Sequence, residues 1–188
     1  LASYAIPYVI INSVSSLYSF VDMILVLRGL ELMGYATSDI EFISSSISTW
    51  AGKINMIVIS IAMGMTISLI PSIVHAYTLK KWDDVNNKIN AAFKIIAFVS
   101  LPMAIGLSLL SKEVWQVFYG ASDIGASILS VSVFVAVSLN FYMITSSIMQ
   151  SLNKYKTVYI ATICGLLSNA ILDIPLMYFL KFIGLPAY

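Results

Sequence analysis

Charged residues are scarce in this sequence. Lysine, arginine, aspartate and glutamate make up 10% of its 188 residues, whereas about 25% is usual in a soluble domain. Hydrophobic residues make up 60% of the chain. This composition excludes an ordinary soluble domain and indicates an integral membrane protein. The net charge of +1 gives no basis for binding nucleic acid.

Residues that usually bind transition metals or form covalent intermediates are also nearly missing. The single cysteine, Cys164, cannot form a disulfide within the chain, and we expect it to pack as a small residue. The single histidine, His75, has no second histidine or cysteine with which to form a zinc site. The sequence contains no glycine-rich phosphate loop and no catalytic triad. It therefore favours a protein that is not an enzyme and uses no organic cofactor.

Long apolar segments make up most of the chain. A helix needs about 20 residues to cross about 30 Å of hydrocarbon. The segments that reach about that length are 5–27, 50–79, 94–111, 126–150 and 157–182. We therefore predict an all-α fold, a polytopic bundle with five transmembrane helices. Residues 113–119 are too few to cross, and we expect a short interfacial helix there, with Trp115 and Tyr119 at the level of the lipid headgroups.

The lysines indicate how these helices are oriented. Two connections carry most of them: Lys80, Lys81, Lys88, Lys94, Lys154 and Lys156. Positively charged connections usually lie in the cytoplasm, so the first and last helices are both expected to run from the inside to the outside. The chain opens on Leu1 with no signal-peptide pattern and closes without a polar tail. From this and the odd number of spans, we expect a fragment of a longer chain.

Two aspartates interrupt the first and last apolar segments. A carboxylate near the middle of a membrane helix costs about 2.5–3.5 kcal/mol on insertion scales, so it needs a partner or a function. Helical spacing places polar or small residues on the same faces: Asn12, Ser15 and Ser19 with Asp22, and Thr162, Gly165 and Asn169 with Asp173. Because the two helices are expected to run parallel, Asp22 and Asp173 should lie at similar depth.

Two interpretations of these aspartates remain open. Two carboxylates and an amide oxygen form a site that suits Na⁺, or a proton if one of the acids stays protonated. Alternatively, each aspartate is only a structural residue that a nearby lysine or a hydrogen bond neutralises.

Lys53 lies about one and a half turns inside the outer end of the second expected helix. Its side chain can extend to the headgroups, face a central cavity and bind an anionic group such as a lipid phosphate, or pair with Asp22. Further along, a stripe of small residues indicates close helix packing, and its members are Ser60, Gly64, Ser68, Ser72 and Ala76. The outer connection at 36–49 is expected to be flexible or re-entrant, or to form a contact surface.

Several stretches resemble the MurJ/SpoVB-type flippases, which belong to the multidrug/oligosaccharidyl-lipid/polysaccharide exporter superfamily. Residues 50–53 (WAGK) and 64–73 (GMTISLIPSI) resemble the eighth helix of these proteins. Residues 101–107 (LPMAIGL) resemble the start of the ninth, and residues 149–154 (MQSLNK) resemble the end of the tenth. Residues 169–186 resemble the eleventh helix and the loop after it.

This resemblance implies a fold and a function. The five helices would be the seventh to eleventh of a MATE-like flippase with two lobes, and residues 1–188 would form part of its C-terminal lobe. Family members move undecaprenyl-linked saccharides, typically lipid II, across the bacterial cytoplasmic membrane by alternating access. The expected partners are a lipid-linked oligosaccharide diphosphate, membrane lipids and the missing N-terminal lobe.

The resemblance also implies roles for individual residues. Family members with a sodium site use an aspartate on the seventh helix, and an asparagine and an aspartate one turn apart on the eleventh. These match Asp22, Asn169 and Asp173, and further ligands would come from the next helix, which lies beyond this sequence. Lys53 stands where the family has a cavity-facing arginine that contacts the diphosphate. Lysine keeps the charge but loses the planar, bidentate geometry.

Three other functions remain as alternatives. A cation-coupled multidrug exporter of the same superfamily would favour an acidic and aromatic cavity, whereas a flippase needs a cationic one. A membrane enzyme acting on prenyl phosphates would need clustered acids at the cytoplasmic face, and only Asp83 and Asp84 lie together there, where a solvated loop or helix cap is the simpler role. A scaffold protein would leave the two buried aspartates unexplained.

Overall fold

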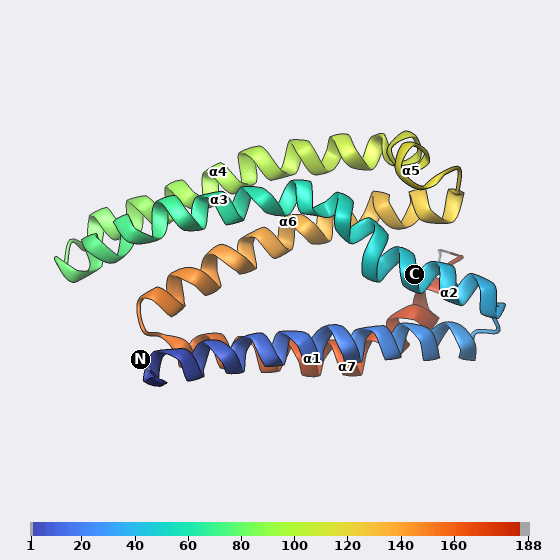
Figure 1. Ribbon diagram of the computed structural model, residues 1–188, viewed down its shortest axis with the longest axis horizontal. Helices are drawn as coiled ribbons and strands as arrows, with labels where there is room; N and C mark the ends of the chain where they lie inside the picture. The colour runs from blue at the N-terminus through green and yellow to red at the C-terminus, as the bar shows by residue number, and fades with distance from the viewer. Residues whose placement is uncertain (1, 185–188) are drawn as a thin grey trace. The chain divides into compact units, whose positions relative to one another are not determined.

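The protein is helical throughout the part that the structure describes (Figure 1). The computed structural model describes the backbone of residues 2–184 and the side chains of residues 13–184 other than Ser15. Its elements are α1 (Ala2–Leu32), α2 (Thr37–Ser45), a π-helical turn η1 (Ser46–Trp50), α3 (Ala51–Thr78), α4 (Trp82–Leu109), α5 (Ser111–Tyr119), α6 (Asp123–Ser151) and α7 (Tyr155–Phe182). The predicted all-α fold class is confirmed.

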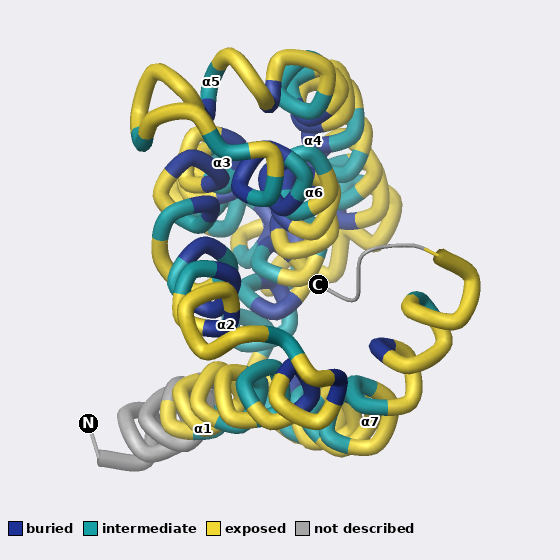
Figure 2. Tube along the Cα trace, turned by 90° about the vertical axis from the view of Figure 1, so that its right-hand side faces the viewer, coloured by how far each residue is buried: buried dark blue, intermediate teal, exposed yellow. Residues whose placement is uncertain are grey.

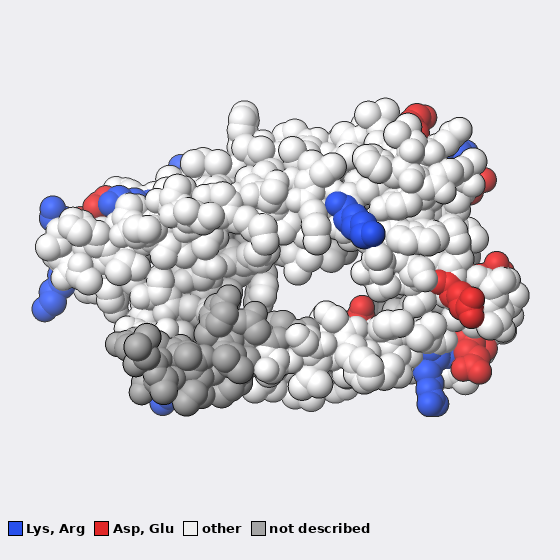
Figure 3. All heavy atoms as spheres, viewed as in Figure 1, with Lys and Arg blue, Asp and Glu red and all other residues white. Residues whose placement is uncertain are grey.

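Four helical stretches in the described residues are long and apolar enough to cross a membrane. They are Thr37–Thr78, Trp82–Leu109, Asp123–Ser151 and Tyr155–Phe182. Each contains or closely matches one of the last four expected spans. The first expected span, 5–27, lies in α1, and the side chains at its start fall outside the described residues, so that crossing stays a prediction. Figure 3 shows a mostly uncharged surface with charged side chains gathered mainly near helix ends, as a bilayer requires.

The helix α4 begins earlier than expected. Its first residue is Trp82, twelve residues before the expected start at Lys94, so Lys88 and Lys94 lie on the helix and not in a loop. The connection is a short turn in which Lys80 adopts a positive φ of 56°. Asp83 and Asp84 fall in the first helical turn, where a negative charge favours the helix dipole. Hydropathy locates only the part of a helix that lies within the bilayer, which explains why the expected start of α4 was twelve residues too late.

The outer connection at 36–49 is also helical, which disfavours a flexible segment there; the re-entrant and contact-surface alternatives stay predictions. The chain leaves α1 through Gly34 at a φ of 79°. It then forms α2, which the turn η1 joins directly to α3. Ile40, Ile43 and Ser44 are buried, so α2 has a face that packs within the protein. This packing gives the segment an order that its polar composition did not indicate.

The chain divides into two compact units. Unit 1 comprises residues 1–48 and 155–188, and unit 2 comprises residues 49–154. In unit 1, α1 and α7 lie side by side, with α2 against α1 (Figure 1). The Nζ of Lys181 donates a hydrogen bond to the carbonyl oxygen of Met33 at 2.7 Å and lies 5.9 Å from the ring centre of Tyr35. Lys181 thereby holds the end of α7 to the end of α1.

In unit 2, α3, α4 and α6 pack on one another, and their buried residues lie where the helices face each other (Figure 2). Asn140 of α6 is fully buried. Its Nδ2 donates to the carbonyl oxygen of Val58 on α3 and to the Oγ of Ser100 on α4, both at 2.9 Å. One side chain thus links all three helices. Within a bilayer, such interhelical hydrogen bonds add to the van der Waals packing between helices.

The short helix α5 confirms the prediction of a non-spanning element, and its residue Trp115 packs inside the protein. Only 1% of its surface is exposed, and it lies against Gly125 at the start of α6. Its ring also packs on Trp50 and Tyr119, with centroids 6.2 Å and 5.0 Å away, and the Tyr119 hydroxyl donates to the Trp50 carbonyl at 3.1 Å. Trp115 is therefore a core residue of unit 2, and the headgroup level expected for it stays a prediction.

Candidate functional site

Two helices of unit 1 bring together the two aspartates and the asparagine that the sequence singled out. The Nδ2 of Asn169 donates to an oxygen of Asp173, one turn along α7, at 2.9 Å. The same nitrogen donates to an oxygen of Asp22 on α1 at 3.2 Å. A spacing of four residues places Asn169 and Asp173 on one helix face, and the packing of α1 along α7 supplies Asp22. One amide group thus holds two carboxylates.

This cluster has more acceptors than donors. The Oδ1 of Asn169 and the Oδ2 of Asp173 are buried and have no hydrogen-bond partner in the described residues. Within the described part of unit 1, neither aspartate forms an ion pair with a lysine or arginine. The structural interpretation therefore stays open, since Asn169 gives each carboxylate one hydrogen bond, although no lysine in the described part of this unit pairs with either. Buried oxygens without donors suit a hard cation or a proton.

Asp22 also lines a small cavity within unit 1. The cavity has a volume of about 170 Å³. Its lining comes from α1 and from the segment of α2 and η1, and comprises Tyr18, Ser19, Asp22, Met23, Val26, Ser44, Ile47 and Ser48. The cavity connects the carboxylate of Asp22 with hydroxyl groups of the outer segment. The sequence alone provided no link between the outer connection at 36–49 and Asp22. A helical interpretation of this segment, with Ser44 and Ser48 one turn apart, would have shown the shared face.

The described residues do not form a complete metal centre. No group of three or more histidine, cysteine, aspartate or glutamate side chains in the described part of the chain lies close enough to hold a metal ion. The cluster offers at most about five side-chain oxygens, two from each carboxylate and one from the amide, whereas hard cations such as Ca²⁺ or Mg²⁺ take about six or more. The orphaned oxygens of Asn169 and Asp173 nevertheless fit Na⁺, with other ligands coming from outside this set. The side chains of Asn12 and Ser15, expected on the same face of α1, lie outside the described residues.

Lys53 belongs to unit 2 and lies in the first turn of α3, where its side chain is exposed. Ser60, Gly64 and Ser68 follow it along the helix and are exposed as well. A Cβ atom at Gly64 would meet nothing within 4 Å, so the prediction of close packing is wrong there within the described chain. Within unit 2, this face of α3 is exposed and carries small side chains. A pair between Lys53 and Asp22 would join the two units and stays a prediction.

The acid pair at the start of α4 has a structural role. The Nζ of Lys88 lies 3.1 Å from the Oδ2 of Asp84, and Asp83 and Asp84 together occupy the first turn of the helix. The residue that precedes the helix is Lys81 and no side chain caps it, so the two acids favour the helix dipole from within the first turn and do not act as a cap.

Comparisons with known proteins agree with the resemblance seen in the sequence. The profile of the MatE family matches residues 44–174. The chain is similar to the lipid II flippase MurJ of Bacillus subtilis (strain 168), with 28% identity over 181 residues that cover 94% of this chain. The chain spans 33% of the length of that protein. No solved structure matches.

The family match extends over well over half of the chain, including α3, α4, α5 and α6 and most of α7. Proteins of this family are transporters and not enzymes, which agrees with the absence of a catalytic motif. The apolar helices place the chain in a bilayer, and the relatives place it in the bacterial cytoplasmic membrane. The chain is therefore a polytopic membrane protein that belongs to the MatE family, within the multidrug/oligosaccharidyl-lipid/polysaccharide exporter superfamily.

Proposed function

We propose that this chain forms part of the C-terminal lobe of a flippase that moves a lipid-linked oligosaccharide diphosphate, such as lipid II, across the membrane. We further propose that Asp22, Asn169 and Asp173 hold a coupling cation, Na⁺ or a proton. The observation that carries the coupling proposal is the single amide of Asn169 held between two carboxylates. The similarity to a lipid II flippase supports the cargo.

Electrostatics explains why the carboxylate pair needs a cation. Two like charges a few ångströms apart interact far more strongly at low dielectric than in water, and each carboxylate alone costs about 2.5–3.5 kcal/mol at the centre of a membrane helix. Asn169 is neutral and offers hydrogen bonds but no balancing charge. A bound Na⁺ or proton would supply that charge, and the unpaired Oδ1 of Asn169 and Oδ2 of Asp173 are the oxygens left to receive it.

Because Asp22 and Asp173 lie on different helices, the charge at this cluster also affects how α1 packs on α7. With the charge balanced, both carboxylates can stay close to Asn169. Without it, repulsion between the carboxylates favours separation of the two helices. This dependence on charge is the property that a cation-coupled transporter requires, because the cation must favour one arrangement of the helices over another.

The exposed face of α3 supports an anionic cargo. Lys53 is a cation on an exposed helix face, and the small side chains of Ser60, Gly64 and Ser68 leave room beside that face. An ammonium group attracts a diphosphate as a point charge, without the bidentate geometry of arginine. We infer that Lys53 contributes attraction and that other groups of the complete protein fix the orientation of the diphosphate.

The test of the cation site uses the substitution Asp173→Asn in the complete protein that contains this chain. The melting temperature is measured in detergent with increasing NaCl, and choline chloride serves as the ionic-strength control. The unsubstituted protein should be stabilised by sodium, or by acid if the cation is a proton. Asp173→Asn should remove that response, because the cluster then carries a single negative charge. Asp123→Asn is the matched control, since this aspartate is exposed and pairs with Lys112 at 2.8 Å. An unchanged response in Asp173→Asn would refute the cation site.

Export of cationic drugs is the second candidate function. It is favoured by the cavity beside Asp22, which is acidic and has Tyr18 and Met23 in its lining. The two candidates predict opposite binding preferences. A flippase should bind a polyprenyl diphosphate and ignore a lipophilic cation such as ethidium, whereas an exporter should show the reverse.

A further inference from the structure

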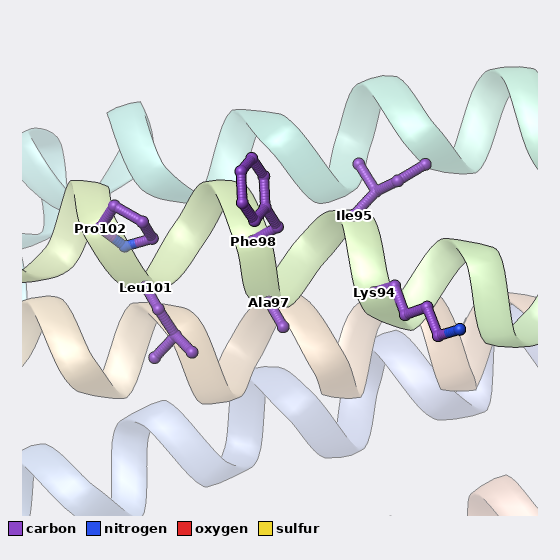
Figure 4. Close-up of a pocket in the computed structure, with 6 residues that line it drawn as sticks. All are labelled: Lys94, Ile95, Ala97, Phe98, Leu101 and Pro102. Atoms are coloured by element: carbon purple, nitrogen blue, oxygen red, sulfur yellow. The ribbon is translucent and has the colours of Figure 1, made fainter.

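A shallow, largely open apolar strip, called the groove below, runs along one side of α4 within unit 2. It has a volume of about 720 Å³. All of its lining residues come from this helix: Lys94, Ile95, Ala97, Phe98, Leu101 and Pro102. Figure 4 shows Lys94 at one end and Pro102 at the other, with Phe98 between them. The groove lies entirely within unit 2 and plays no part in the proposed coupling.

The groove faces outward from the three-helix bundle. On the opposite side of α4, Ala92, Ile96 and Ser100 are fully buried, because this side packs on α3 and α6. Phe98, in contrast, is 81% exposed. A large exposed aromatic ring on the outer side of a membrane helix is suited to contact with lipid chains.

Lys94 supplies the single charge of the groove. The neighbouring lysine, Lys88, already pairs with Asp84 at 3.1 Å and donates to the Ser72 carbonyl at 3.2 Å. Lys94 is exposed, and in the described residues of unit 2 it pairs with no acidic group. A free ammonium group at one end of an apolar groove is complementary to a molecule with an anionic head and a hydrocarbon tail.

The length of the groove matches one leaflet. A helix rises about 1.5 Å per residue, so Phe98 lies about 6 Å and Pro102 about 12 Å beyond Lys94. Half of the hydrocarbon core is about 15 Å thick. The positive-inside orientation places Lys94 towards the cytoplasmic face, which is the leaflet where anionic lipids attract basic residues.

We propose that this groove is a binding site for an anionic phospholipid of the inner leaflet. The lipid phosphate pairs with the Nζ of Lys94, and one acyl chain lies along Ile95, Phe98 and Leu101 as far as Pro102. The inference is independent of the proposed cargo and of the cation site, because it uses only the outward face of α4.

The experiment measures lipids retained by the complete protein after extraction from vesicles of phosphatidylcholine and phosphatidylglycerol, using native mass spectrometry. Lys94→Gln should lower the preference for phosphatidylglycerol by about fivefold, which is what about 1 kcal/mol for one basic residue near the membrane surface predicts. Lys81→Gln is the matched control, because Lys81 is an exposed lysine just before the start of α4, on the side expected to be cytoplasmic and outside the groove. It should change the preference much less.

A second substitution tests the acyl-chain part of the site. Ala97→Phe fills the groove and keeps Lys94, so it should reduce the retention of both lipids. Thermal unfolding of each variant verifies that the protein remains folded. An unchanged preference in Lys94→Gln, or an equal loss in Lys81→Gln, would overturn the proposal. Full retention of both lipids in Ala97→Phe would also overturn the proposal, because another segment of the protein or general surface charge would then explain the lipid retention.

Discussion

The contact between Gly125 and Trp115 leads to a prediction about stability. Gly125 lies in the first turn of α6, and a Cβ atom added there would overlap the indole ring of Trp115. Trp115 is buried and packed against Trp50 and Tyr119, so the ring has no free space into which it can turn. Gly125→Ala should therefore force a shift of the ring or of α5.

The expected cost follows from two opposing effects. Overpacking of a close-packed core typically costs about 1–3 kcal/mol. Replacing glycine by alanine in a helix returns about 0.5–1 kcal/mol through the lower entropy of the unfolded chain. The net loss should thus be at most about 2.5 kcal/mol, or up to about 10 °C in melting temperature for a domain of this size.

The assay is thermal unfolding of the purified protein in detergent. Gly64→Ala is the matched control, since a Cβ at Gly64 meets nothing within 4 Å, and it should leave the melting temperature unchanged or raise it. The double variant Gly125→Ala with Trp115→Phe should recover part of the loss, because the smaller ring leaves room for the methyl group. If Gly125→Ala proved as stable as Gly64→Ala, the reasoning about this contact would be refuted.

Two further predictions concern unit 2. Asn140→Leu removes the hydrogen bonds to Val58 and Ser100. In a denaturation assay it should cost about 0.6–1.7 kcal/mol, the range from the average to the largest value for interhelical hydrogen bonds. Adding Ser100→Ala should cost little more, because the bond that it would break is already lost, and fully additive costs would contradict a shared bond. Lys53→Ala should weaken the binding of a polyprenyl diphosphate more than Lys53→Arg does in a titration with the complete protein, and equal affinities would leave Lys53 as a headgroup anchor.

Sequence periodicity was sufficient to find the cluster of aspartates because helical geometry is regular. Asn169 and Asp173 are four residues apart, so any helix places them on one face. Charged connections then indicated that α1 and α7 run parallel, which placed Asp22 at a similar depth. The structure brings these three residues together, and their role with a cation stays a prediction.

Packing was the information that the sequence did not provide. The polar start of α4 was taken for a loop because hydropathy reports the surrounding solvent and not the backbone conformation. Trp115 was expected at the headgroups because aromatic residues are common there, and its burial against Gly125 could not be read from the sequence. The stripe that contains Gly64 was expected to pack closely, and its exposed face shows that small residues can also leave a surface open.

The two hydrogen bonds of Asn169 differ in what they join. The bond to Asp173, at 2.9 Å, lies within α7, whereas the bond to Asp22, at 3.2 Å, connects α7 to another helix. Any force that moves the two helices apart will stretch the second bond and leave the first intact. Asn169 would then stay with Asp173 and release Asp22 to the neighbouring cavity. If the cluster holds the proposed cation, loss of that cation and separation of the two helices would thus both act on this one hydrogen bond.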